Sequence, residues 1–123
     1  MALAGGTTPK LTYSLIAAEP FFEIIPWDRV RWFLGDERFV PSDDDASNYR
    51  MAKESLFDAA NVSPDTVFRV KTELGEPPAA AEDYERIIKE VVPAGADGVP
   101  VFDLVLLGMG ADGHTASLFP HTS

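Results

Sequence analysis

Residues 102–120 of this 123-residue chain read FDLVLLGMGADGHTASLFP, and this stretch decides the fold. Residues 104–107 are all apolar and are bounded by turn formers, which predicts a strand covered on both faces, as in a parallel sheet. Three glycines, an aspartate and a histidine follow it. Ligands of open α/β sheets bind at the carboxyl ends of strands, so His114 lies where a site is expected.

This glycine-rich turn also has an ordinary interpretation. Gly108, Gly110 and Gly113 allow the backbone to turn tightly and to approach a ligand, while Asp112 can bond to its own backbone and hold the turn. Taken alone, an Asp-Gly-His sequence is more often a polar turn than a site. The rest of the chain changes that balance.

Polar residues also follow two other predicted strands. Residues 30–34 (VRWFL) are β-branched and aromatic, and they lead directly into GDER at 35–38. Residues 1–4 predict the end of a strand and are followed by GGTTP at 5–9. If the three strands are parallel neighbours, the loops after them surround one crevice.

The GGTTP loop at residues 5–9 predicts a phosphate site. Glycine N–H groups, two threonine hydroxyls and the positive end of a following helix all favour an oxyanion. The sequence matches neither the Walker pattern nor the dinucleotide-binding pattern, so a simple turn is an equal alternative for the isolated motif.

The remaining segments alternate between helix and strand. We expect a helix with Thr8 as N-cap and Pro9 as its first residue, and a second helix capped by Ser47-Asn48 that runs to about Ala60. Residues 67–70 predict a short strand, and residues 79–92 predict an amphipathic helix. The inward positions expected are Leu11, Leu15 and Ala18 in the first helix, Met51, Ser55 and Leu56 in the second, and Tyr84, Ile87, Ile88 and Val91 in the last.

Composition excludes several classes of function. The chain is 46% hydrophobic and long enough to bury a core, and it has no run of about 18 apolar residues that would predict a membrane span. It has no cysteine, which excludes disulfides and a thiol nucleophile and fits a reducing, cytoplasmic setting. A net charge of −10 opposes binding to nucleic acid.

In so acidic a chain, a small anion has to be held by local donors. The candidates are the loop amides and the side chains of Lys10, Arg38, Arg50 and Lys53, although each basic residue alone is more simply a solvated surface group. The acidic run at 43–45 resembles a metal cluster only superficially, because adjacent carboxylates do not converge. We therefore predict no metal site.

Four motifs together resemble the 6-phosphogluconolactonase family: GGTTP at 5–9, WFLGDERFVP at 32–41, SNY at 47–49, and residues 102–120. The related glucosamine-6-phosphate deaminases share the Asp-Gly-His core, but there the histidine precedes an IAFNEP type of sequence that brings a glutamate. TASLFP follows His114 here, and Arg38 stands where the deaminases tend to carry tyrosine. Both differences favour the lactonase.

The resemblance implies an α/β fold, namely a partial Rossmann-like open parallel sheet with flanking helices. Family members extend beyond both ends of residues 1–123, so we expect one incomplete domain whose uncovered edges favour self-association. A deaminase-like isomerase and a non-catalytic sugar-phosphate-binding fragment remain alternatives.

The implied reaction is hydrolysis of 6-phospho-D-glucono-1,5-lactone to 6-phosphogluconate, without metal or organic cofactor. His114 would be the general base, Arg38 or backbone N–H groups near residues 110–113 would stabilise the oxyanion, and Asp36 would orient His114 or a sugar hydroxyl. The phosphate would be bound by Gly5, Gly6, Thr7 and Thr8. Further contacts to the substrate or the oxyanion are expected from Gly110, Asp112, Gly113 and Asn48.

Overall fold

A parallel sheet forms the centre of the computed structural model, which describes residues 1–122. Its strands are β1 (Ala2–Leu3), β2 (Trp32–Leu34) and β3 (Val67–Phe68), in the order β1-β2-β3. Ala2 lies opposite Phe33, and Trp32 lies opposite Val67. All three strands fall within segments that the sequence predicts as strands.

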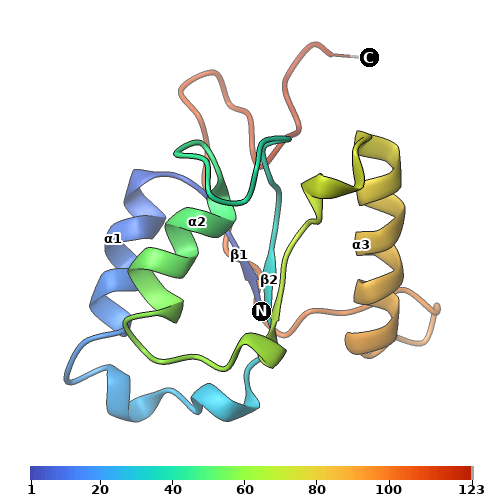
Figure 1. The fold of residues 1–123 in the computed structure, drawn as a ribbon. Helices are drawn as coiled ribbons and strands as arrows, with labels where there is room; N and C mark the ends of the chain where they lie inside the picture. The colour runs from blue at the N-terminus through green and yellow to red at the C-terminus, as the bar shows by residue number, and fades with distance from the viewer. Residues whose placement is uncertain (123) are drawn as a thin grey trace.

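Helices cover both faces of the sheet, which confirms the predicted α/β class. On one face lie α1 (Thr7–Ile16) and α2 (Asn48–Ala52), and α3 (Pro77–Val91) lies on the other (Figure 1). The other described elements are a π-helix, Lys53–Phe57, and four short 3-10 helices, Phe22–Ile24, Trp27–Arg29, Pro64–Thr66 and Thr72–Leu74. Within residues 1–122, every helix falls short of the length and apolarity that a bilayer crossing requires. The cytoplasmic setting stays a prediction.

Successive side chains of β2 point to opposite faces of the sheet. Because helices cover both faces, all three residues of β2 are buried. Trp32 packs with α1 and α2, and its ring lies 5.8 Å from that of Phe57. Phe33 points the other way and stacks on Phe68 at 4.9 Å. The predicted inward residues of α3 pack around Phe33, as expected: Tyr84, Ile87, Ile88 and Val91.

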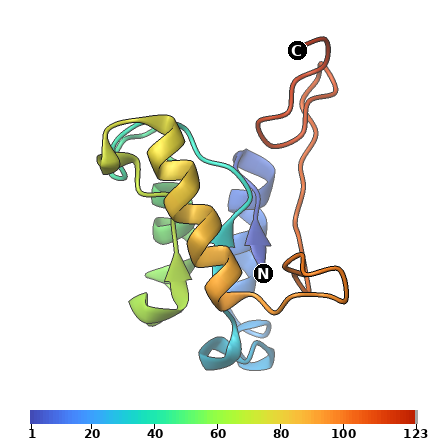
Figure 2. The same cartoon turned by 90° about the vertical axis from the view of Figure 1, so that its right-hand side faces the viewer.

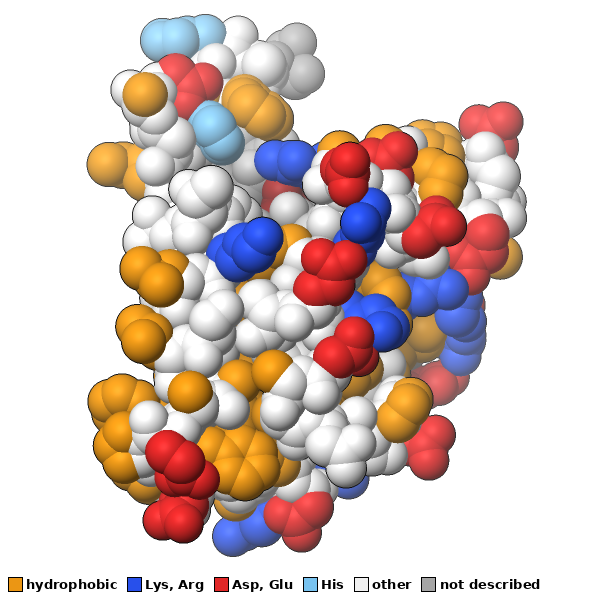
Figure 3. Space-filling view, turned by 60° about the vertical axis from the view of Figure 1, so that its left-hand side comes forward, with side chains coloured by type: hydrophobic (Ala, Val, Ile, Leu, Met, Phe, Trp, Pro, Cys, Tyr) orange, Lys and Arg blue, Asp and Glu red, His pale blue; other side chains and the backbone are white. Residues whose placement is uncertain are grey.

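Helix α1 differs from its prediction in both start and face. Its N-cap is Gly6 rather than Thr8, so Pro9 is the third helical residue, where a missing N–H is still tolerated. Tyr13 is the buried residue, and its hydroxyl donates to the Ala4 carbonyl at 2.8 Å. With Tyr13 facing the sheet, Leu11 and Leu15 lie on the opposite side, 64% and 53% exposed. Figure 3 shows apolar side chains gathered along the left edge of the molecular surface in that view.

Helix α2 begins as predicted, with Ser47 as the N-cap, whose hydroxyl accepts from the Arg50 N–H at 3.1 Å. Beyond Ala52 the chain continues as a π-helix, Lys53–Phe57, rather than as an α-helix. Ser55 and Leu56 are buried, as expected, and Met51 is half-buried.

Residues 104–107 do not form the buried strand that their apolar sequence predicts. Val105 makes one parallel bridge to Ala2, with hydrogen bonds of 2.9 Å from Ala2 N to Leu104 O and from Leu106 N to Ala2 O. The neighbouring strand β1 has only two residues, and no described helix covers this edge, so Leu107 is 65% exposed. Figure 2 shows the segment running along the outside of the molecule. Self-association through this edge stays a prediction.

Candidate functional site

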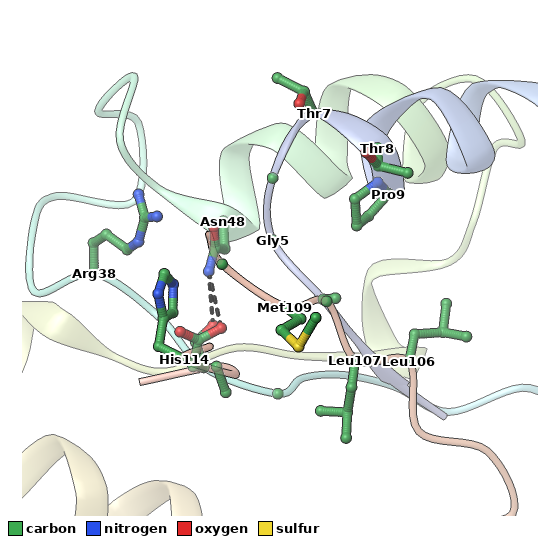
Figure 4. Close-up of a pocket in the computed structure, with 17 residues that line it drawn as sticks. Gly5, Thr7, Thr8, Pro9, Arg38, Asn48, Leu106, Leu107, Met109 and His114 are labelled. Carbon is green, nitrogen blue, oxygen red and sulfur yellow. Dashed lines mark hydrogen bonds between the residues drawn. The ribbon is translucent and has the colours of Figure 1, made fainter. Parts of the chain in front are cut away.

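A cavity of about 440 Å³ lies at the carboxyl ends of the strands, where three loops meet (Figure 4). The structure thus brings together the segments that the sequence placed around one crevice. Of the predicted site residues, Gly5, Gly6, Thr7, Thr8, Asp36, Arg38, Asn48, Gly110 and His114 line the cavity. Asp112 and Gly113 are not among its lining residues. The chemical roles of all these residues stay predictions.

The glycine-threonine loop leads from β1 into the first turn of α1. Gly6 adopts a φ of 106°, a conformation that favours glycine, and Thr7 and Thr8 are the first helical residues. Their N–H groups precede the first intrahelical hydrogen bonds and are free to bind an anion at the positive end of the helix dipole. Gly5 is required for a different reason, because a Cβ there would lie 2.1 Å from Asn48 Oδ1.

Glu37 is used to hold the start of α2 rather than to line the cavity. Its carboxylate accepts from Asn48 N at 2.7 Å, from Tyr49 N at 2.9 Å and from Ser47 Oγ at 3.0 Å. A carboxylate at a helix N-terminus satisfies backbone donors and favours the helix dipole. Glu37 therefore fixes α2 and, with it, the Asn48 side chain.

Asp36 contacts two side chains from different loops. Asn48 Nδ2 donates to its backbone oxygen and to Oδ1, each at 3.2 Å, and Ser117 Oγ donates to Oδ2 at 2.7 Å (Figure 4 shows the Asn48 bonds). The sequence predicts that Asp36 orients either His114 or a sugar hydroxyl. The structure shows a different partner for that imidazole.

His114 is oriented by Asp112, two residues before it. His114 Nδ1 lies 2.5 Å from Asp112 Oδ1, and the His114 N–H donates to the same oxygen at 3.1 Å. These hydrogen bonds from His114 hold the pKa of Asp112 below its ordinary value. The imidazole also stacks on Phe119, with ring centroids 4.6 Å apart. Asp112 thus contacts the imidazole, and its expected contact with the substrate or the oxyanion stays a prediction.

Arg38 is the basic side chain that lines the cavity, and one of its N–H groups donates to the Ala46 carbonyl at 3.2 Å. A guanidinium has five N–H donors, so others can reach a ligand. Two of the other predicted anion-binding residues are used elsewhere. Arg50 pairs with Asp45 at 2.6 Å and with Glu54 at 2.8 Å, and Lys53 pairs with Asp58 at 2.7 Å. Lys10 is not among the lining residues.

Sequence reasoning missed two residues that shape this site, Glu37 and Ser117. A serine followed by a polar residue signals a helix start, yet nothing in a run of Asp-Glu-Arg tells which carboxylate turns back to it. The contact between Ser117 and Asp36 joins residues 81 positions apart. Only the fold brings these two side chains together.

The parallel sheet, the glycine-rich helix start and the carboxylate-supported histidine define an α/β protein with a cavity at the carboxyl ends of its strands. Residues 1–123 match the family described as glucosamine-6-phosphate isomerases/6-phosphogluconolactonase. The chain belongs to this family, which confirms the resemblance seen in the motifs.

Individual relatives agree with that assignment. The chain is 46% identical over 121 residues to a 6-phosphogluconolactonase of Treponema pallidum, covering 98% of this chain and 49% of the relative. It is 40% identical over 121 residues to that of Haemophilus influenzae, covering 98% and 50%. The crystal structure of 6-phosphogluconolactonase from Thermotoga maritima superposes with a TM-score of 0.82 at 42% identity, covering 96% and 49%. The chain spans about half the length of these relatives.

Proposed function

We propose that this chain carries the hydrolytic site of a 6-phosphogluconolactonase and cleaves 6-phospho-D-glucono-1,5-lactone to 6-phosphogluconate. Relatives of that name match nearly the whole chain. The observation that carries the proposal is the single cavity that holds both His114 and the glycine-threonine loop at the start of α1. This arrangement would set a base opposite an anchor for phosphate.

The contact with Asp112 suits His114 to act as a base. An ionised carboxylate at Nδ1 favours the tautomer that carries its proton there, which leaves Nε2 with a free lone pair. Nε2 would take a proton from water as the water oxygen attacks the lactone carbonyl carbon. The tetrahedral intermediate would then collapse, the bond to the ring oxygen would break, and that oxygen would take the proton from His114. The reaction needs no redox partner and leaves a carboxylic acid and a hydroxyl.

Arg38 is the stronger candidate for the oxyanion donor, because two of the four amides at residues 110–113 are already used. The Gly110 N–H already donates to His114 O at 2.8 Å, and the Gly113 N–H donates to Gly110 O at 2.9 Å. Both amides are thus committed to the turn that carries His114. The Arg38 guanidinium lines the cavity and can face the negative charge that develops on the carbonyl oxygen.

The phosphate would lie at the start of α1, against Thr7 and Thr8. Figure 4 shows these two residues at one side of the cavity and Arg38 and His114 at the other. An anchored phosphate fixes the lactone carbonyl near the base, so its binding contributes to rate as well as to affinity. A deaminase would be expected to carry a glutamate after the histidine, and residues 115–120 contain no carboxylate.

The proposal is tested by comparing the purified chain with two histidine variants. The chain should hydrolyse the lactone faster than the spontaneous reaction, and His114→Ala should lower the enzymatic rate by roughly 100-fold or more, the usual contribution of a general base. His121→Ala is the matched control, because His121 is exposed and outside the cavity. It should keep the wild-type rate.

Three outcomes would contradict the proposal. Equal rates with and without His114 would remove its role as base. A wild-type chain that only matches the spontaneous rate, but whose melting temperature rises with 6-phosphogluconate, would be a binding fragment instead. Release of ammonia from glucosamine 6-phosphate would indicate a deaminase.

A further inference from the structure

The segment that carries His114, residues 108–122, is ordered mainly by contacts within itself. Gly110 and His114 close one turn, and Thr115 and Leu118 exchange two backbone hydrogen bonds of 3.3 and 2.9 Å in a second. The Thr115 hydroxyl donates back to the Gly108 carbonyl at 2.8 Å. The segment contains no helix or strand among its described residues, so no regular element fixes its position.

One side-chain hydrogen bond fastens this unit to the rest of the molecule. Across residues 1–122, the contact of Ser117 Oγ with Asp36 Oδ2, at 2.7 Å, is the hydrogen bond that joins residues 108–122 to residues 1–107. Its acceptor is a carboxylate, and hydrogen bonds to charged groups are stronger than neutral ones. Asp36 is held in turn by Asn48, whose helix start is fixed by Glu37.

The backbone beside Ser117 supports a specific rather than an accidental contact. Ala116 has a φ of 49°, in the left-handed region that an alanine rarely adopts. Residues 116 and 117 form the tip of the turn between Thr115 and Leu118, and Ala116 itself lines the cavity. An unfavourable backbone conformation persists only where neighbouring contacts hold it in place. The conformation of Ala116 places the Ser117 hydroxyl against Asp36.

We propose that Ser117 is a positioning residue that ties the His114 segment to Asp36 and so fixes the imidazole against the cavity. The inference rests on the proposed lactonase function, and it assigns Ser117 no contact with the substrate. Loss of the hydroxyl leaves the turns intact and frees the whole unit to move. Because displacement of a catalytic group by about 1 Å can cost up to 100-fold in rate, an exposed tether of this kind should matter for turnover more than for stability.

The test compares Ser117→Ala with Ser117→Thr, which keeps the hydroxyl, and with Ser14→Ala, which removes a hydroxyl bonded within α1. Ser117→Ala should lower kcat by about tenfold with KM changed less than about twofold, because positioning acts on the transition state. Backbone ¹⁵N relaxation should show greater mobility across residues 108–122 in that variant. Ser117→Thr should restore both properties, and Ser14→Ala should match the wild type.

The two readouts separate this inference from the function on which it rests. Wild-type order across residues 108–122 in Ser117→Ala would overturn the tether, and increased mobility with an unchanged kcat would overturn the positioning role. If the wild-type chain shows no turnover, the proposed function fails. The relaxation data, compared between Ser117→Ala and wild type, then still test whether Ser117 holds residues 108–122 in place.

Discussion

Single glycines set the shape of the site through the space they leave empty. A Cβ at Gly110 would lie 2.1 Å from His114 Cε1 and 2.2 Å from its Nδ1. A separation below 3.0 Å forces something to move, and in an exposed loop the side chain moves at little cost in stability. The imidazole is the group displaced, so Gly110 protects the position of His114.

Gly110→Ala should therefore reduce lactone hydrolysis by roughly tenfold or more, because the imidazole is pushed away from its hydrogen bond with Asp112. Gly95→Ala is the matched control, since a Cβ there also crowds a side chain, at 3.1 Å from Val101 Cγ2, but Gly95 does not line the cavity. Steady-state rates of the two variants at equal concentration provide the measurement. Comparable activities in both would show that the space at Gly110 is irrelevant to the site.

At this scale the sequence predicts which residue types gather but not which atoms meet. His114, Arg38 and the glycine-threonine loop are recognisable, because each follows a strand and has a distinct chemistry. Carboxylates are different. Asp36, Glu37 and Asp112 are alike in sequence, yet one binds Asn48 and Ser117, one caps α2 and one holds the imidazole. Those assignments depend on sub-ångström placement that no local pattern encodes.

Among the elements, α2 is the one whose start determines the site. The N–H groups of its first three residues are all satisfied by side chains, two by Glu37 and the third, on Arg50, by Ser47. An unsatisfied first turn is the usual weakness of a short helix. Glu37 thus couples the loop after β2 to the helix that carries Asn48.

Glu37→Ala should lower the free energy of unfolding by about 1–2 kcal/mol, the usual cost of losing a helix cap. Urea denaturation followed by circular dichroism measures this. Glu90→Ala is a suitable control, because Glu90 is paired with Arg86 on the exposed face of α3, where a single ion pair contributes little. Coincident unfolding curves for Glu37→Ala and wild type would show that the cap is dispensable.

The elements also show where apolar pattern misleads. Residues 104–107 have the sequence of a buried strand, and they lie parallel to β1 as predicted, yet they form only one bridge. An apolar pattern indicates that a segment favours burial, but strand pairing also needs a neighbouring strand of matching length. Here the neighbour is β1, which has only two residues. Helix α1 also buries a different face from the one that its apolar pattern predicts. The Tyr13 hydroxyl donates to the carbonyl of Ala4, just after β1, and neither Leu11 nor Leu15 could make that hydrogen bond.

In the molecule as a whole, two tyrosines attach the helical layers to the strand ends from opposite faces. Tyr13 of α1 donates to the carbonyl of Ala4, just after β1. Tyr84 of α3 donates to the carbonyl of Leu34, the last residue of β2, at 2.9 Å, and accepts from its N–H at 2.8 Å. Each attachment lies one or two residues before a site loop. The layers therefore hold the loops in place through neutral hydroxyls that are removed from water.

These hydroxyls predict a loss of stability in alkaline solution. Burial raises the pKa of Tyr13 to about 12 and raises that of Tyr84 as well, whereas an unfolded tyrosine ionises near 10. Between about pH 10 and 12 the unfolded chain releases protons that the folded chain retains, so the free energy of unfolding falls as pH rises.

Urea midpoints measured across this range should decline less steeply for Tyr13→Phe and Tyr84→Phe, because neither phenylalanine can ionise. Since both variants also lose hydrogen bonds, they should start below the wild type at pH 8 and approach it by pH 12. Curves that stay parallel to the wild-type curve throughout would show that neither tyrosine controls the alkaline transition.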